Sequence, residues 1–209
     1  MFYLSLDKIK NVAMCPKGPE IVKWFSDRFP EDMELPLMNV FDKFGDVHTV
    51  FCLRAVNGGP EFALSYTIEC VRRVKKTFEN EFPGNPLFYE CLLVAQKSLS
   101  PLYRDDFNID CAREAGKNME KFCNSNNTVN SQERRNAIKA GLAASRVAYA
   151  AYTLSQPHAS VDYSLGAIEE ARDAADNAKL EDLWQSNRLK ELLLAHKDEH
   201  ISNSSDQEN

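Results

Sequence analysis

The sequence contains no apolar run that approaches the ~18 residues needed to cross a bilayer. Its first ten residues, MFYLSLDKIK, lack the basic segment and following apolar stretch of a secretory leader. Close cysteine pairs, on which zinc sites usually draw, are missing too, because no two of the six cysteines lie within ten residues of each other. We therefore expect a cytoplasmic protein that binds no metal and whose reduced cysteines pack on apolar faces.

Signals for β-strands and for catalysis are also scarce. No long run of β-branched residues alternates with polar ones, and no Asn-Gly pair joins two such runs as a hairpin. The eight glycines form no phosphate-binding loop, and the chain has no nucleophile elbow and no Cys–His pair in a recognisable catalytic context. The sequence thus predicts a helical protein with no catalytic residues and no cofactor.

Lysine and arginine are few in the C-terminal part of the sequence. The net charge is −6, and the residues from 160 onward carry twelve Asp and Glu against five Lys and Arg. Nucleic acid is not expected as a partner, because phosphate contacts need lysine and arginine. Apolar residues are plentiful by comparison: they make up 44% of the chain, and twelve Phe, seven Tyr and two Trp can fill a sizeable core.

Helical spacing, broken by proline and glycine, runs along the whole chain. The clearest case is an apolar stripe between Pro60 and Pro83, whose steps of three and four residues predict one amphipathic helix of about six turns. The stripe consists of Leu64, Ile68, Val71, Val74, Phe78 and Phe82. Short helices are expected within the first sixty residues, and longer ones at 87–99, 108–122, 131–154, 160–178 and 180–195, with 123–130 as a polar linker.

These patterns together predict an all-α fold. We expect one compact domain of about eight or nine helices over residues 1–200, with a subdivision near 124–130 as the alternative. Residues 201–209 carry almost no apolar surface to bury, so they are expected to form a disordered tail.

The helix expected at 131–154 is built mainly of alanine, glycine, serine and tyrosine, and Asn130 with Glu133 can form a capping box at its start. Small side chains let neighbouring helices approach closely, which predicts a central position. The expected contacts are Ile138, Leu142, Ser145, Tyr149 and Tyr152. Replacing Ala144 or Ala148 with leucine should then overpack the core and cost ~1–3 kcal/mol. An unchanged melting temperature in both variants would instead place the helix at the periphery.

Two groups of charged residues are the predicted partner-binding residues. The basic group flanks Val71 and Val74 on the outer faces of the expected helix, and the acidic group lies in the C-terminal part. They comprise Arg72, Arg73, Lys75 and Lys76, and Glu169, Glu170 and Asp173. A solvated helix face is the simpler interpretation of each group. Arg134, Arg135 and Lys139 form a weaker basic group.

Two arrangements have the spacing of a metal site. Glu170 and Asp173 share a helical face that can hold Mg²⁺, as in all-helical nucleotide pyrophosphohydrolases, but the preceding helix offers only Glu133 as a matching carboxylate. His196 and His200 are four residues apart and can face the same way, although they lie at the end of the last helix, where little would hold them. Both arrangements are more simply explained as exposed residues.

Three segments carry a family resemblance: CPKGPEIVKWF at 15–25, AGLAASRVAYAAY at 140–152, and CVRRVKKTFENEFPGNPLFYECLLVAQKSL at 70–99. The first two together resemble Ala-Tyr-rich helical proteins of unknown function from bacteriophages and bacteria. The third is similar to bacterial immunity proteins. The resemblance implies an accessory protein of the phage–host or toxin–immunity setting that acts by binding.

We accordingly expect a noncatalytic binding or inhibitor protein whose partner is a protein of host or rival origin. The alternative is a small-molecule protein, either a nucleotide-binding sponge or a Mg²⁺-dependent all-α nucleotide hydrolase that uses Glu170 and Asp173. A homo-oligomer is a third expectation.

Overall fold

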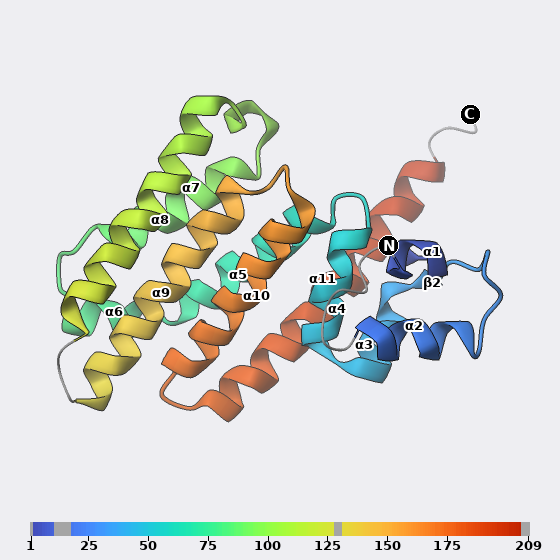
Figure 1. Cartoon of the computed structure of the whole chain (residues 1–209), viewed down its shortest axis with the longest axis horizontal. Helices are drawn as coiled ribbons and strands as arrows, with labels where there is room; N and C mark the ends of the chain where they lie inside the picture. Colours follow the sequence, from blue (N-terminus) through green and yellow to red (C-terminus); the bar gives the residue numbers. More distant parts are fainter. Residues whose placement is uncertain (1, 11–17, 128–130, 206–209) are drawn as a thin grey trace. The chain divides into compact units, whose positions relative to one another are not determined.

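The computed structural model describes residues 2–10, 18–127 and 131–205. Within these ranges the chain forms eleven α-helices, two short 3₁₀ helices and one two-stranded ribbon, so the predicted all-α fold is confirmed (Figure 1). No helix in the described residues is both long and apolar enough to span a membrane. Cys15 and Asn130 lie outside the described residues, and with them part of the CPKG turn and the expected capping box.

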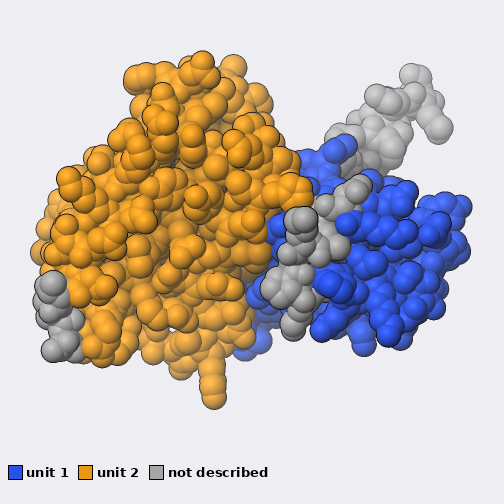
Figure 2. Space-filling model, in the orientation of Figure 1, with its two compact units in different colours: residues 1–59, 183–209 blue, residues 60–182 orange. Residues whose placement is uncertain are grey.

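The chain divides into two compact units, residues 60–182 and residues 1–59 together with 183–209 (Figure 2). Helix α11, Ala178–Ser205, supplies its first residues to the former and the rest to the latter. The expected single domain over 1–200 and tail from 201 stay predictions.

The discontinuous unit, 1–59 with 183–209, consists of short elements. Its helices are α1 (Leu6–Lys10), α2 (Gly18–Ser26), α3 (Leu37–Phe44), α4 (Asp46–Cys52) and the 3₁₀ helix η1 (Leu53–Ala55). The sequence did not predict its ribbon, in which β1 (Tyr3–Leu4) pairs antiparallel with β2 (Leu35–Pro36). Leu4 lies opposite Leu35 and both are buried, so the pairing is stabilised by core packing rather than by length.

Aromatic rings hold this unit together. The ring of Trp24 lies edge-on to Phe29 and to Phe44, with centroids 5.5 and 5.4 Å apart. At the other end of the sequence, His196 of α11 stacks on Phe2 at 4.3 Å. The unit's core therefore needs residues from both ends of its discontinuous sequence.

The predicted six-turn helix between Pro60 and Pro83 is wrong, because Val74 interrupts it. The chain instead forms α5 (Gly59–Arg73) and α6 (Lys75–Glu81), and at Val74 the backbone (φ −95°, ψ 8°) leaves the helical region. The amide of Val74 donates to the carbonyl of Val71, three residues back, which tightens the turn. The apolar stripe itself is confirmed, since all six of its residues are buried. Beyond the break, Phe82 packs edge-on against Phe122 at 4.8 Å.

The later helices differ from prediction at their ends. They are α7 (Leu87–Ser98), η2 (Pro101–Tyr103), α8 (Asp106–Asn126), α9 (Gln132–Tyr152) and α10 (Pro157–Ala174). Helix α8 continues into the expected linker, and the side chain of Asn126 donates to a carbonyl of its last turn. Helix α10 begins at Pro157, a residue suited to the first turn, rather than at Ser160. Ser160 is buried instead, and its hydroxyl donates to the carbonyl of Ala150 at 2.9 Å.

The alanine-rich helix α9 lies at the centre of the 60–182 unit, as predicted. It packs against α6, α7, α8 and α10, and Figure 1 shows it between α8 and α10. The hydroxyl of Ser145 donates to the carbonyl of Gly116 on α8 at 2.8 Å. This short side chain can reach the α8 backbone only because α8 and α9 pack closely. Ala144 and Ala148 are fully buried, and the expected contacts Tyr149 and Tyr152 are only half-buried at the rim. Ser131 caps the helix by accepting from the amide of Arg134.

The described cysteines form no disulfide, in agreement with the sequence. Four are buried and Cys111 is half-buried. Burial raises the pKa of the Cys70 and Cys123 thiols to about 12 and also raises that of Cys91. These thiols are apolar packing groups rather than nucleophiles.

Candidate functional site

Arg73, from the predicted basic group, is bound within its own unit. Its Nε donates to both carboxylate oxygens of Glu181 at 2.9 and 3.1 Å. Glu181 is 5% exposed, so the pair ties the end of α5 to the first turn of α11. The charge of Arg73 is therefore paired within the fold, although the side chain is still 42% exposed.

The other three basic residues have exposed partners, or none among the described residues. Arg72 donates to Gln96 on α7 at 2.7 Å, and Lys75 pairs with Glu79 one turn later at 3.2 Å. Lys76 is exposed and makes no ion pair with a described residue. The structure thus leaves Lys76 as the most available cation of the group.

The acidic residues of α10 face cations of α9. Asp173 accepts from Lys139 at 2.7 Å, and Glu170 lies 3.5 Å from Arg146, whereas Glu169 is exposed and makes no ion pair with a described residue. Two cations beside the carboxylate pair disfavour Mg²⁺ there. Among the described residues, no three His, Cys, Asp or Glu side chains are grouped to hold a metal ion. His196 stacks on Phe2, and the side chain of His200 is outside the described set.

An exposed apolar tip lies where α7 turns into α8, and the sequence did not identify it. We define the tip as Leu102, Tyr103 and Phe107. Leu102 is 86% exposed and Phe107 76%, more than any other large apolar side chain in the described residues. Exposed large apolar side chains close together in the chain, here on η2 and at the start of α8, are typical of protein-binding surfaces.

Hydrogen bonds hold this turn in one conformation. Arg104 donates from Nε to the carbonyl of Ser98 at 3.0 Å and from Nη1 to Glu61 on α5 at 3.0 Å. On the other side, Asp105 caps α8 by accepting from the amide of Asn108 at 2.9 Å. The segment that carries the apolar side chains is therefore hydrogen-bonded on both sides of Arg104, and a backbone ordered before binding loses less entropy on binding.

A small pocket of about 190 Å³ adjoins the tip. Its walls come from α5, α7, α8, α9 and the turn after α9. They consist of Glu61, Ser98, Tyr103, Arg104, Ile109, Ala151, Tyr152, Leu154 and Ser155. Tip and pocket share Tyr103, so together they form a projection beside a recess, a shape that a protein partner can match.

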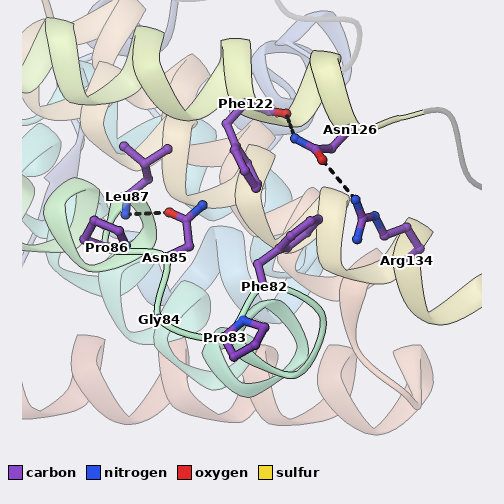
Figure 3. A pocket seen from close by; sticks show the side chains of 9 residues that line it. All are labelled: Phe82, Pro83, Gly84, Asn85, Pro86, Leu87, Phe122, Asn126 and Arg134. Carbon is purple, nitrogen blue, oxygen red and sulfur yellow. Dashed lines mark hydrogen bonds between the residues drawn. The ribbon is translucent and has the colours of Figure 1, made fainter.

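A second depression, of about 490 Å³, lies where the turn between α6 and α7 meets α8 and the start of α9 (Figure 3). We call it the Arg134 depression. It is shallow and open, and its lining is Phe82, Pro83, Gly84, Asn85, Pro86, Leu87, Phe122, Asn126 and Arg134. The guanidinium of Arg134 stacks 4.2 Å from the centre of the Phe82 ring and donates to Asn126 Oδ1 at 2.9 Å. Arg134, of the weaker basic group, therefore lines this depression.

Comparisons with family models, with curated proteins and with solved structures find no match to this chain. The functional argument therefore rests on the residues themselves. The tip was missed because Leu102 and Phe107 lie outside every apolar stripe, between the helices predicted at 87–99 and 108–122. Bulky apolar residues on a short connection, away from any stripe, are the signal that identifies it.

Proposed function

We propose that this is a noncatalytic cytoplasmic protein that acts by binding another protein, in the phage–host or toxin–immunity setting that its resemblance implies. The observation that carries the proposal is the tip, where Leu102 and Phe107 stand exposed on a braced turn. Solvent-exposed apolar side chains cost free energy in the unbound protein, and burying them against a partner recovers it.

The charges beside the tip indicate the partner's chemistry. Asp105 and Asp106 are exposed next to Phe107, and Asp106 makes no ion pair with a described residue. A complementary surface would offer an apolar recess with a basic rim. The predicted contacts Lys76 and Glu169, which have no ion pair within the described chain, would add peripheral contacts at most.

Affinity capture from bacterial lysate tests the proposal. The bait is compared with the double variant Leu102→Ser, Phe107→Ser and with a matched control, Tyr89→Ser, which removes another exposed ring (59% exposed) away from the tip. We expect the wild-type bait and the Tyr89 control to enrich the same protein and the tip variant to lose it.

Two results would overturn the proposal. One is a bait that enriches no protein, or a capture that the tip variant leaves unchanged. The other is thermal stabilisation of the protein by a nucleotide with Mg²⁺ that Asp173→Ala abolishes, which would favour the nucleotide-binding or hydrolase alternative.

A further inference from the structure

The Arg134 depression combines an apolar floor with a single cation. Phe82 and Phe122 meet edge-to-face at 4.8 Å in its centre, and Figure 3 shows Arg134 on one side of the two rings and Asn85 on the other. Arg134 belongs to the weaker basic group, Asn85 to no predicted group, and neither lies at the tip. The depression is therefore a separate candidate site.

Its unused hydrogen-bonding groups are mainly donors. The guanidinium of Arg134 makes one hydrogen bond within the described chain, to Asn126, which leaves further N–H groups on a side chain that is 22% exposed. Asn85 accepts from the amide of Leu87 at 3.0 Å, and its NH₂ group has no hydrogen-bond partner among the described residues. A ligand for this surface should bring acceptors and an apolar group.

The local charge favours a singly charged ligand. One arginine is present, and Glu81 lies 4.0 Å from its Nη1, close enough to repel a multiply charged anion. A carboxylate matches the planar guanidinium with two parallel hydrogen bonds, while a phosphate would bring more charge than one arginine balances.

The shape of the depression favours a chain end over a small molecule. Pockets for small ligands enclose most of the ligand, whereas this depression is shallow and open to solvent. A peptide can place its last residue in such a depression while the preceding residues continue over the surface.

We propose that the Arg134 depression binds the free C-terminal carboxylate of a protein partner whose last residue is apolar. The carboxylate pairs with Arg134, the last side chain rests on Phe82 and Phe122, and the amide of Asn85 donates to a backbone carbonyl nearer the middle of the peptide. This inference rests on the proposed protein-binding function and adds how one partner class is recognised.

Fluorescence anisotropy with a short labelled Gly-Ser peptide ending in phenylalanine tests the inference. Its free acid should bind at least about tenfold more tightly than its C-terminal amide, because the amide loses a charge-assisted hydrogen bond. The small acid hydrocinnamate should compete only weakly. Equal affinity for acid and amide, or hydrocinnamate binding as tightly as the peptide, would overturn the assignment.

Three single variants are expected to change the affinity for the peptide acid in different directions. Arg134→Gln should weaken binding of the acid by about tenfold, and Arg135→Gln, which removes the same charge from an exposed neighbour that does not line the depression, should leave it unchanged. Glu81→Gln should tighten binding by about two- to fivefold, because it removes the anion that competes for Arg134. A gain of affinity cannot come from misfolding, so an unchanged or weaker Glu81→Gln variant would contradict the site even if Arg134→Gln proved unstable.

The peptide assay tests the Arg134 depression and the capture assay tests the tip, so either assay can fail without the other. The tip variant Leu102→Ser, Phe107→Ser should bind the peptide normally. If the peptide does not bind while capture still depends on the tip, only the Arg134 depression is wrong; if neither assay succeeds, the protein-binding function fails as well.

Discussion

Glycine at position 141 sets how closely α8 and α9 can approach. A Cβ at this position would lie 2.6 Å from the sulfur of Cys123 and 3.2 Å from both Met119 Sδ and Phe78 Cε2, where ordinary contacts are 3.4–4 Å. The Gly141→Ala change gains about 1 kcal/mol of helix propensity, but overpacking a dense core costs about 1–3 kcal/mol. We therefore expect a net loss of about 1 kcal/mol, or a melting temperature lower by about 2–4 °C.

A second glycine supplies the matched control. At Gly166, on α10, the three atoms nearest to a new Cβ all belong to the side chain of Arg146, which is flexible and can move away. Arg146 would then give up at most its 3.5 Å ion pair with Glu170, a contribution of about 0–1 kcal/mol. The helix-propensity gain offsets that loss, so Gly166→Ala should be neutral or stabilising.

Urea unfolding followed by far-UV circular dichroism measures both variants. The expected result is a lower midpoint for Gly141→Ala, an equal or higher midpoint for Gly166→Ala, and unchanged m-values. If Gly141→Ala is as stable as the wild type, or if Gly166→Ala is the more destabilising change, then α8 and α9 do not pack as closely as described.

Two further predictions concern ionisable groups of the 60–182 unit. Arg73→Ala leaves the buried carboxylate of Glu181 without its arginine and should lower the unfolding free energy by about 1–2 kcal/mol, whereas Lys75→Ala, which removes a surface pair, should cost less than about 0.5 kcal/mol in the same urea titration. Cys70 and Cys123 have pKa values raised to about 12 by burial, so they stay protonated in the folded state after the unfolded thiols ionise near 9. Their contribution to stability is therefore complete below pH 9 and falls as pH rises toward 12, and stability that does not fall over this range would contradict their burial.

Helix type and core composition could be predicted from sequence because apolar periodicity reports them directly. The stripe from Leu64 to Phe82 is buried as expected, and the small residues of α9 mark its central position. The break at Val74 could not be predicted, since the apolar steps of three and four continue through it without a proline or glycine. The ribbon of β1 and β2 escaped detection because two residues are too few to show a period.

The partners of the charged residues could not be predicted from the sequence. Sequence places Arg73 and Asp173 on outward helix faces but cannot reveal that Glu181 and Lys139, 108 and 34 positions away, lie opposite them. The Arg134 depression likewise depends on tertiary contacts, because it joins residues of α7, α8 and α9 with the turn between α6 and α7. Such sites depend on tertiary contacts that a local pattern does not contain.

Because one unit is discontinuous in sequence, its two parts are synthesised at different times. Residues 60–182 form one uninterrupted segment, and α9 contacts its immediate sequence neighbours α8 and α10, so this unit can fold rapidly once residue 182 has left the ribosome. Residues 1–59 are made before that unit, but their contact with α11, such as the stack of Phe2 on His196, cannot form until residues 183–209 are made. A segment made before the 60–182 unit is thus completed after it, and its apolar surface is exposed to chaperones and proteases in the interval.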